Sequence, residues 1–116
     1  IPECASVGLK ESQAREQGFN VKVSKFPFSA NGRAVSIGET DGLVKVVGDA
    51  DTGKILGMHI LGPHADDLIH EGALAMKANL TAREVAEMIH AHPTLPEAVL
   101  EALHGVQDKP LHLLTR

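Results

Sequence analysis

Apolar and polar residues alternate from Phe19 to Phe26, with a period of two. Phe19, Val21 and Val23 are separated by polar residues, which predicts a strand with these three side chains on its buried face. Proline has no backbone N–H to donate to a neighbouring strand, so we expect Pro27 to end this strand.

A shorter strand and a helix are expected before it. Cys4 to Leu9 has the composition of a short strand, and Glu11 to Gln17 that of a short helix. Gly18 follows this helix directly, and glycine readily takes the left-handed conformation that ends helices. The chain should therefore begin in the order strand, helix, strand.

Two further β-rich segments flank a cluster of turn residues and predict a hairpin. They are Gly42 to Val47 and Ile55 to Leu61, joined by a polar stretch at residues 48–54. Part of this stretch is similar to a calcium loop, but such a loop needs a bidentate glutamate at its twelfth position, where this chain has Ile60. We interpret the stretch as a turn.

Beyond the hairpin the apolar period changes to that of a helix. One helical face carries six apolar or small residues: Ala65, Leu68, Ile69, Gly72, Ala73 and Met76. The small Gly72 and Ala73 at its centre would let another backbone approach closely, from the same sheet or from a partner subunit. A capping box at Thr81 to Glu84 predicts a second helix that runs to about Ile89.

These elements predict an α+β domain whose antiparallel sheet has its helices packed on one side, because the helices follow the strands. With 116 residues, 43% of them hydrophobic, the chain is long enough for a single domain, 1–116. A net charge of −4 argues against nucleic acid or an anionic membrane as a partner, and no apolar run has the length of a membrane helix. Because Ile1 is not an initiator, we expect a fragment of a longer protein.

The segment His90 to Glu97 brings imidazole and carboxylate groups close together at the start of an expected helix. A histidine titrates near neutral pH, and a carboxylate bonded to one ring nitrogen fixes the tautomer and raises the basicity of the other. This combination indicates a general base. Such a pair can take a proton from a thiol.

The same segment also has a purely structural interpretation. Thr94 to Glu97 fits a capping box, in which Thr94 is the N-cap and Glu97 accepts from the Thr94 N–H. Pro96 suits the first turn of a helix, where its missing N–H costs nothing. Spacing alone favours the cap over the base.

Metal, disulfide and cofactor motifs are missing from the sequence. Cys4 is the only cysteine, so we expect a reducing compartment and a packed Cys4 side chain. The seven histidines form neither an HExxH nor a paired-cysteine pattern, so we expect no metal site, a structural role for His59 and no catalytic role for His112. No glycine-rich phosphate loop occurs, so we expect no cofactor to bind within this chain.

Motifs in register along nearly the whole chain resemble the C-terminal interface domain of dihydrolipoamide dehydrogenases, of the pyridine nucleotide-disulfide oxidoreductase family. They are Pro2-Glu3 with Val7-Gly8, Phe26 to Ala34, Thr40 to Gly42, Leu56 to Pro63, Leu68 to Glu71 and His90 to Glu97. At Leu95 and at the two histidines 90 and 92, the sequence resembles that of dihydrolipoamide dehydrogenases more than that of glutathione or mercuric reductases, which share the fold. The family usually has Ser or Thr where this chain has Pro96, so hydrogen bonding there is expected to differ.

The resemblance implies a fold and two site residues. The fold is the interface domain of flavin disulfide reductases, a dimerisation domain without the flavin- and nicotinamide-binding domains. In that family the histidine before the proline, here His92, deprotonates the dithiol substrate at the partner subunit's flavin and redox disulfide, and the glutamate, here Glu97, orients it. We therefore prefer the base to the cap. We also expect a cis bond between His92 and Pro93, with the imidazole pointing away from the core.

The resemblance also implies the cofactors and partners of a parent enzyme. They are FAD and NAD, a lipoyl group as substrate, a homodimer, and the acyltransferase subunit of a 2-oxo acid dehydrogenase complex. We expect the fragment alone to be inactive, and its location to be the bacterial cytoplasm rather than the mitochondrial matrix. The dimer contact should include apolar residues of Leu68 to Met76. Two alternatives stay open: the same domain of another flavin disulfide reductase, and a non-catalytic self-association module.

Overall fold

The structure, a computed structural model, describes residues 3–106. Four strands form one antiparallel sheet in the order β1-β4-β3-β2. The strands are β1 (Glu3–Gly8), β2 (Val21–Pro27), β3 (Leu43–Asp49) and β4 (Ile55–Gly62). The helices are α1 (Glu11–Glu16), α2 (Gly32–Ile37), α3 (Ala65–Lys77), α4 (Ala82–Ala86) and α5 (Pro96–Val106), with a 3-10 turn, η1 (Phe28–Ala30), before α2.

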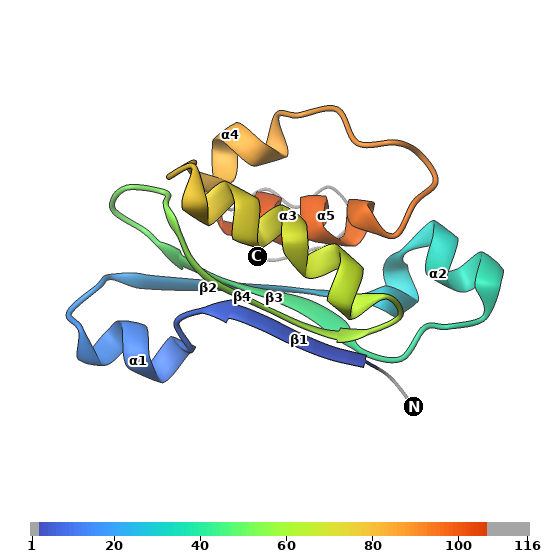
Figure 1. Ribbon diagram of the computed structural model, residues 1–116, viewed down its shortest axis with the longest axis horizontal. Helices are drawn as coiled ribbons and strands as arrows, with labels where there is room; N and C mark the ends of the chain where they lie inside the picture. Colours follow the sequence, from blue (N-terminus) through green and yellow to red (C-terminus); the bar gives the residue numbers. More distant parts are fainter. Residues whose placement is uncertain (1–2, 107–116) are drawn as a thin grey trace.

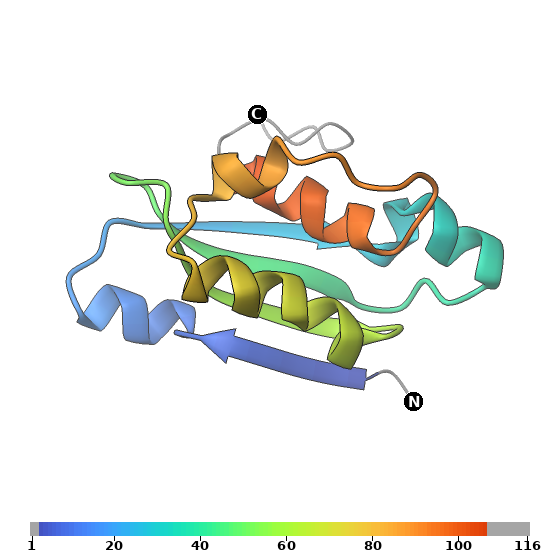
Figure 2. The ribbon, with the colours of Figure 1, turned by 45° about the horizontal axis from the view of Figure 1, so that its top comes forward.

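The sheet forms one layer and the three C-terminal helices form a second (Figure 1). α3 packs on β1 and β4, α5 packs on β2 and β3, and α4 lies beside α5, as Figure 2 also shows. α1 is on the opposite side of the sheet, where Glu11 forms an ion pair with Lys45 at 3.3 Å. The predicted fold class is confirmed. No helix within residues 3–106 is both long and apolar enough to cross a bilayer.

The hydrophobic core lies between the sheet and these three helices. Alternate side chains of β3 and β4 point toward the helices, and those at the centre are at most 1% exposed: Val44, Val46, Met58 and Ile60. Gly72 of α3 faces Met58 so closely that a Cβ at this position would lie 2.7 Å from the Met58 sulfur. Gly72 therefore serves the approach of the helix to its own sheet.

β2 turns the opposite face to the core from the one predicted. Ser24 and Phe26 are 6% and 1% exposed, whereas Val21 and Val23 are only partly buried. The reason is the position of α5, which packs against the Ser24 side of the strand. Gly105 of α5 has no side chain and leaves room for the serine hydroxyl. The apolar period along β2 alone does not contain this information.

β2 ends at Pro27, as predicted, and proline is tolerated at this position because β2 is an edge strand of the described sheet. Two residues of the edge strands differ from prediction. β2 begins at Val21, so Phe19 lies outside it and is 37% exposed. Cys4 was predicted to be packed, but it is exposed because it points from edge strand β1 away from the helices.

α4 has the predicted beginning but not the predicted end. Its capping box is present: the Thr81 hydroxyl accepts from the Glu84 N–H at 3.1 Å, and the Glu84 carboxylate accepts from the Thr81 N–H at 2.8 Å. The helix ends at Ala86 rather than near Ile89. Ile89 is 94% exposed, so the side chain expected to anchor the last turn has no core to pack against.

η1 and α2 were not predicted, because this stretch is too short to show an apolar period. Asn31 caps α2, since its side-chain oxygen accepts from the Ala34 N–H at 2.8 Å. Gly38 ends the helix in the left-handed conformation with φ 74°. Asn31 also brings the start of α2 next to the start of α5, because its side chain contacts Thr94.

The turn between β3 and β4 is stabilised by Asp49, as expected for a turn rather than a calcium loop. One oxygen of its carboxylate accepts from the Asp51 N–H and the other from the Thr52 hydroxyl, both at 2.9 Å. The hydrogen bond from the Asp51 backbone, and then that from Thr52, hold the pKa of Asp49 below its ordinary value. Both oxygens of this carboxylate are thus occupied within the turn.

The packing of α5 on β2 gives a stability prediction. A Cβ at Gly105 would overlap the Ser24 hydroxyl and lie 2.8 Å from the Ser24 Cβ, so Gly105→Ala should destabilise the fold by about 1–3 kcal/mol. A Cβ at Gly32 would meet nothing within 4 Å, so Gly32→Ala should change stability by about 0.5 kcal/mol or less. Urea unfolding of the two variants measures both effects. Equal unfolding midpoints would show that α5 does not depend on this contact.

Candidate active site

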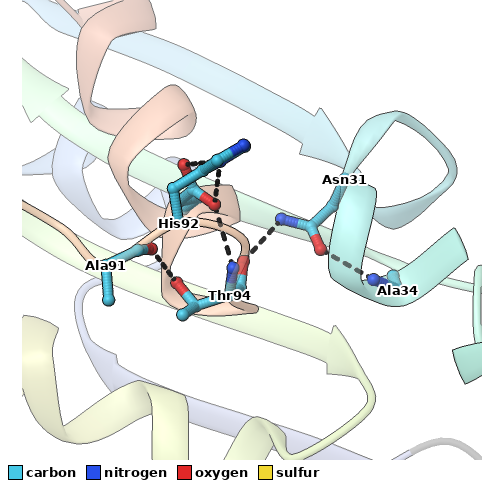
Figure 3. A network of polar contacts seen from close by, with 6 residues as sticks. Asn31, Ala34, Ala91, His92 and Thr94 are labelled. Atoms are coloured by element: carbon cyan, nitrogen blue, oxygen red, sulfur yellow. Dashed lines mark hydrogen bonds and ion pairs between the residues drawn. The ribbon is translucent and has the colours of Figure 1, made fainter. Parts of the chain in front are cut away.

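His92 lies in the segment between α4 and α5, and Glu97 lies in the first turn of α5 (Figure 3). The His92–Pro93 bond is cis, as predicted. The His92 side chain is 79% exposed, so the imidazole points away from the core as expected, while the Glu97 side chain is only 24% exposed. A surface imidazole is thus held by a largely covered carboxylate.

The two side chains are in direct contact. His92 Nδ1 lies 3.0 Å from Glu97 Oε1 and 2.9 Å from Oε2. Because a carboxylate can only accept hydrogen bonds, this contact assigns the proton of a neutral ring to Nδ1 and leaves the lone pair on Nε2. Within residues 3–106, Nε2 has no hydrogen-bond partner, and Figure 3 shows the second ring nitrogen pointing away from the network. The ring is ready to accept a proton at Nε2.

Glu97 also takes part in the cap of α5. Its Oε1 accepts from the Thr94 N–H at 2.9 Å, which is one half of the predicted capping box. The other half is absent, because the Thr94 hydroxyl donates to the Ala91 carbonyl at 2.6 Å instead of accepting from the helix. The structural and the chemical interpretations of Glu97 are therefore compatible. One carboxylate binds the backbone and the imidazole together.

Asn31 holds this turn from the side of α2, a role that sequence reasoning missed. The residue is 4% exposed, and its Nδ2 donates to the Thr94 carbonyl at 3.0 Å. Its Oδ1 simultaneously accepts from the Ala34 N–H, as Figure 3 shows. The Asn-Gly pair at the start of α2 signals a cap, but the contact with a residue 63 positions away is not visible in the sequence.

The space beside the pair is too small for a substrate or a cofactor. A cavity of about 50 Å³ is lined by residues that include Asn31, His92 and Glu97. Ligand sites are several times larger. A wider hollow of about 600 Å³ is on the other sheet face, next to α1 and His59, and contains no glycine-rich loop. Within residues 3–106, neither space offers the glycine-rich loop that holds the phosphates of a flavin or a nicotinamide.

Two other histidines, His59 and His112, were predicted to have no catalytic role. Both ring nitrogens of His59 are bonded at 2.9 Å, one to the Ser6 hydroxyl and the other to the Leu9 carbonyl, as expected for a satisfied residue of a strand. His112 lies outside the described residues. Within residues 3–106, no three side chains of His, Cys, Asp or Glu cluster as a metal site would require.

Comparison with known families gives the chain its classification. The family model for "Pyridine nucleotide-disulphide oxidoreductase, dimerisation domain" matches residues 1–103. The chain belongs to this family. Both the fold and the position of the His92 segment at the surface are in keeping with a domain that meets a second subunit.

Members of this family that are similar to the chain are much longer. The dihydrolipoyl dehydrogenase of Thermus scotoductus is 49% identical over 99% of this chain and 25% of its own length. That of Bacillus subtilis is 51% identical over 96% of this chain and 23% of its own. The flavoprotein disulfide reductase RclA of Escherichia coli, solved as a Cu(II) complex, matches with a TM-score of 0.84 and 27% identity over 91% of this chain and 26% of that one. The chain spans about a quarter of these relatives.

The link from Asn31 to the turn can be tested with two substitutions at one position. Asn31→Ala removes both hydrogen bonds, so the amides of Ala34 and Thr94 should both exchange faster. Asn31→Asp keeps an acceptor for the Ala34 N–H but cannot donate to the Thr94 carbonyl, so only the Thr94 amide should exchange faster. Amide hydrogen exchange by NMR reports both sites. Unchanged exchange of the Thr94 amide in both variants would mean that Asn31 does not hold the turn.

Proposed function

We propose that this chain is the dimerisation domain of a dihydrolipoyl dehydrogenase, in which His92 is the general base and Glu97 orients it. The observation that carries the proposal is the state of the His92 ring. Nδ1 faces the Glu97 carboxylate at 2.9 Å, and the side chain is 79% exposed. A general base needs a fixed tautomer and an accessible lone pair, and His92 combines the two. Relatives at 49% and 51% identity support the choice of reaction.

In this proposal the chain contributes one proton transfer. Nε2 of His92 accepts the proton as the S–H bond of a dihydrolipoyl thiol breaks, and the resulting thiolate is the nucleophile of thiol-disulfide exchange. The Glu97 carboxylate stabilises the imidazolium that forms and keeps the ring oriented. In the complete reaction the dithiol is oxidised to a disulfide, NAD takes up a hydride, and one proton is released.

The redox disulfide and the cofactors belong to other parts of the parent enzyme in this proposal. FAD and NAD, bound there, supply the hydride transfer. This chain has one cysteine and no glycine-rich phosphate loop, so it needs those parts for activity. His92 is on the surface and points outward, and we infer that the substrate sulfur reaches it from a second subunit.

A homodimer is the assembly that we propose. Three large apolar side chains on α3 and on the segment after α4 are exposed, Leu74 at 70%, Met88 at 53% and Ile89 at 94%, which supports a contact that covers them. The family's name and the prevalence of two-fold pairing support the same conclusion. The expected contact through apolar residues of Leu68 to Met76 stays a prediction. Most of that helix face packs on the sheet, and Leu74 is the large apolar side chain in this range that is exposed.

The partners of the parent enzyme follow from the same proposal. They are a lipoyl group as substrate and the acyltransferase subunit of a 2-oxo acid dehydrogenase complex, in the bacterial cytoplasm. The dihydrolipoyl dehydrogenases of Thermus scotoductus and Bacillus subtilis support a bacterial source. The net charge of −4 supports partners other than nucleic acid.

Two alternatives make different predictions. The same domain of another flavin disulfide reductase is supported by the structural match to RclA, and it would act on a different thiol or disulfide. A non-catalytic self-association module is supported by the role of Glu97 in the cap of α5. If the first alternative holds, the parent enzyme should not oxidise dihydrolipoamide. In the second, loss of the His92 imidazole would leave activity unchanged.

In the intact parent enzyme, His92→Gln should reduce the oxidation of dihydrolipoamide by NAD by roughly a hundredfold to ten-thousandfold. Reduction of an artificial acceptor by NADH should persist, because that reaction deprotonates no thiol. Glu97→Gln should slow the first reaction as well, since the ring loses its charged partner. Steady-state assays of both reactions separate loss of the base from loss of folding.

His70→Gln is the matched control, because His70 is an exposed histidine on α3 and should tolerate the change in both assays. If the two activities of the His92 variant fell together, the residue would be structural. If neither activity changed, His92 would not be the base.

A further inference from the structure

A second histidine–glutamate pair lies just before the first. His90 Nε2 is 2.6 Å from Oε2 of Glu71, a residue of α3 that lies 19 positions earlier in the chain. The His90 side chain is 3% exposed and that of Glu71 is 21% exposed. His92, two residues later, is 79% exposed. The two imidazoles therefore have opposite environments.

Both ring nitrogens of His90 face acceptors. Nε2 faces the Glu71 carboxylate, and Nδ1 lies 2.9 Å from the Met88 carbonyl oxygen. A neutral imidazole has only one N–H, so both contacts are hydrogen bonds only when the pair carries one further proton, on the ring or on the carboxylate. As an ion pair, the His90 ring donates to both acceptors. The ring then joins α3 to the backbone before His92.

His90 is the inward side chain of a segment that otherwise faces solvent. Met88 and Ile89 are 53% and 94% exposed, and Ala91 is also exposed. After His92, the chain is held by the bonds of Thr94 with Ala91 and Glu97 and by Asn31. Before His92, the contact of His90 with Glu71 ties the segment to another element. The base therefore lies between two points of attachment.

We propose that the His90–Glu71 pair positions His92 for proton transfer. This inference rests on the proposed function of His92, and it assigns His90 and Glu71 the role of positioning residues that touch neither substrate nor cofactor. Without the pair, the segment after α4 would keep its attachment only on the α5 side. A base displaced by about 1 Å can lose on the order of a hundredfold in rate.

Isosteric variants of the intact parent enzyme distinguish the contact with α3 from the local one. The amide nitrogen of asparagine superimposes on Nδ1 of histidine, and that of glutamine on Nε2. His90→Asn thus keeps a donor for the Met88 carbonyl but loses the hydrogen bond to the Glu71 carboxylate. His90→Gln keeps a donor for the Glu71 carboxylate but loses the hydrogen bond to the Met88 carbonyl. Positioning through α3 predicts that glutamine rescues the function and asparagine does not.

The expected result is a fall in kcat for dihydrolipoamide oxidation of about tenfold to a hundredfold in His90→Asn, with a similar fall in kcat/KM. Glu71→Ala should behave like His90→Asn, and His90→Gln should stay within about threefold of the wild type. NADH-dependent reduction of an artificial acceptor should be unchanged in all three. His70→Asn, at an exposed histidine next to Glu71, should affect neither assay.

A double variant tests whether His90 acts through His92. In the His92→Gln background, adding His90→Asn should cause no further loss, because a positioning residue has no effect once the base is gone. A full additional loss would overturn the proposal, as would wild-type kcat in His90→Asn or a parallel fall of both activities. An unaffected His92→Gln enzyme would overturn the proposed function, and this inference with it. A slow His92→Gln enzyme with a normal His90→Asn enzyme would overturn only the positioning role.

Discussion

The hydrogen bonds accepted by the Glu97 carboxylate are the interaction on which the candidate site depends. One oxygen receives the Thr94 N–H, and both oxygens lie within 3.0 Å of His92 Nδ1. The carboxylate therefore fixes the backbone turn and the imidazole in a single arrangement. Because Glu97 is in the first turn of α5, the orientation of the base follows from the position of that helix.

The rest of the fold keeps α5 and the turn in place. Gly105 lets α5 pack directly on Ser24 of β2, and Asn31 connects the turn to the start of α2. On the other side of His92, Glu71 of α3 holds His90. Elements far apart in the sequence thus hold the chain on both sides of one exposed imidazole. Because α3, α4 and α5 pack on the same side of the sheet, the segment between α4 and α5 lies at the surface (Figure 2).

Features that depend on local pattern could be predicted from the sequence. The β3–β4 hairpin, the capping box of α4 and the apolar face of α3 all follow from residues within a few positions of one another. His92 and Glu97 are five residues apart, and resemblance to a known family indicated their pairing. The structure is compatible with both interpretations of Glu97, because one carboxylate accepts a hydrogen bond from the Thr94 backbone and also contacts the His92 ring.

Features that depend on distant contacts could not be predicted. Which face of β2 is buried depends on α5, which comes about 70 residues later and packs against Ser24. Likewise, the contacts of Asn31 with Thr94 and of Glu71 with His90 connect positions 63 and 19 residues apart. The exposure of Cys4 follows from the place of β1 at the edge of the sheet. Local sequence carries no direct signal for such contacts.

The tautomer of His92 tests the central claim most directly. Ring ¹⁵N chemical shifts of His92, measured in the neutral state of the imidazole, distinguish a protonated from an unprotonated nitrogen. The contact with Glu97 predicts a proton on Nδ1 and a lone pair on Nε2, the reverse of the preference of free histidine in water. A proton on Nε2, or the tautomer mixture of free histidine, would show that Glu97 does not orient the ring and would contradict the account.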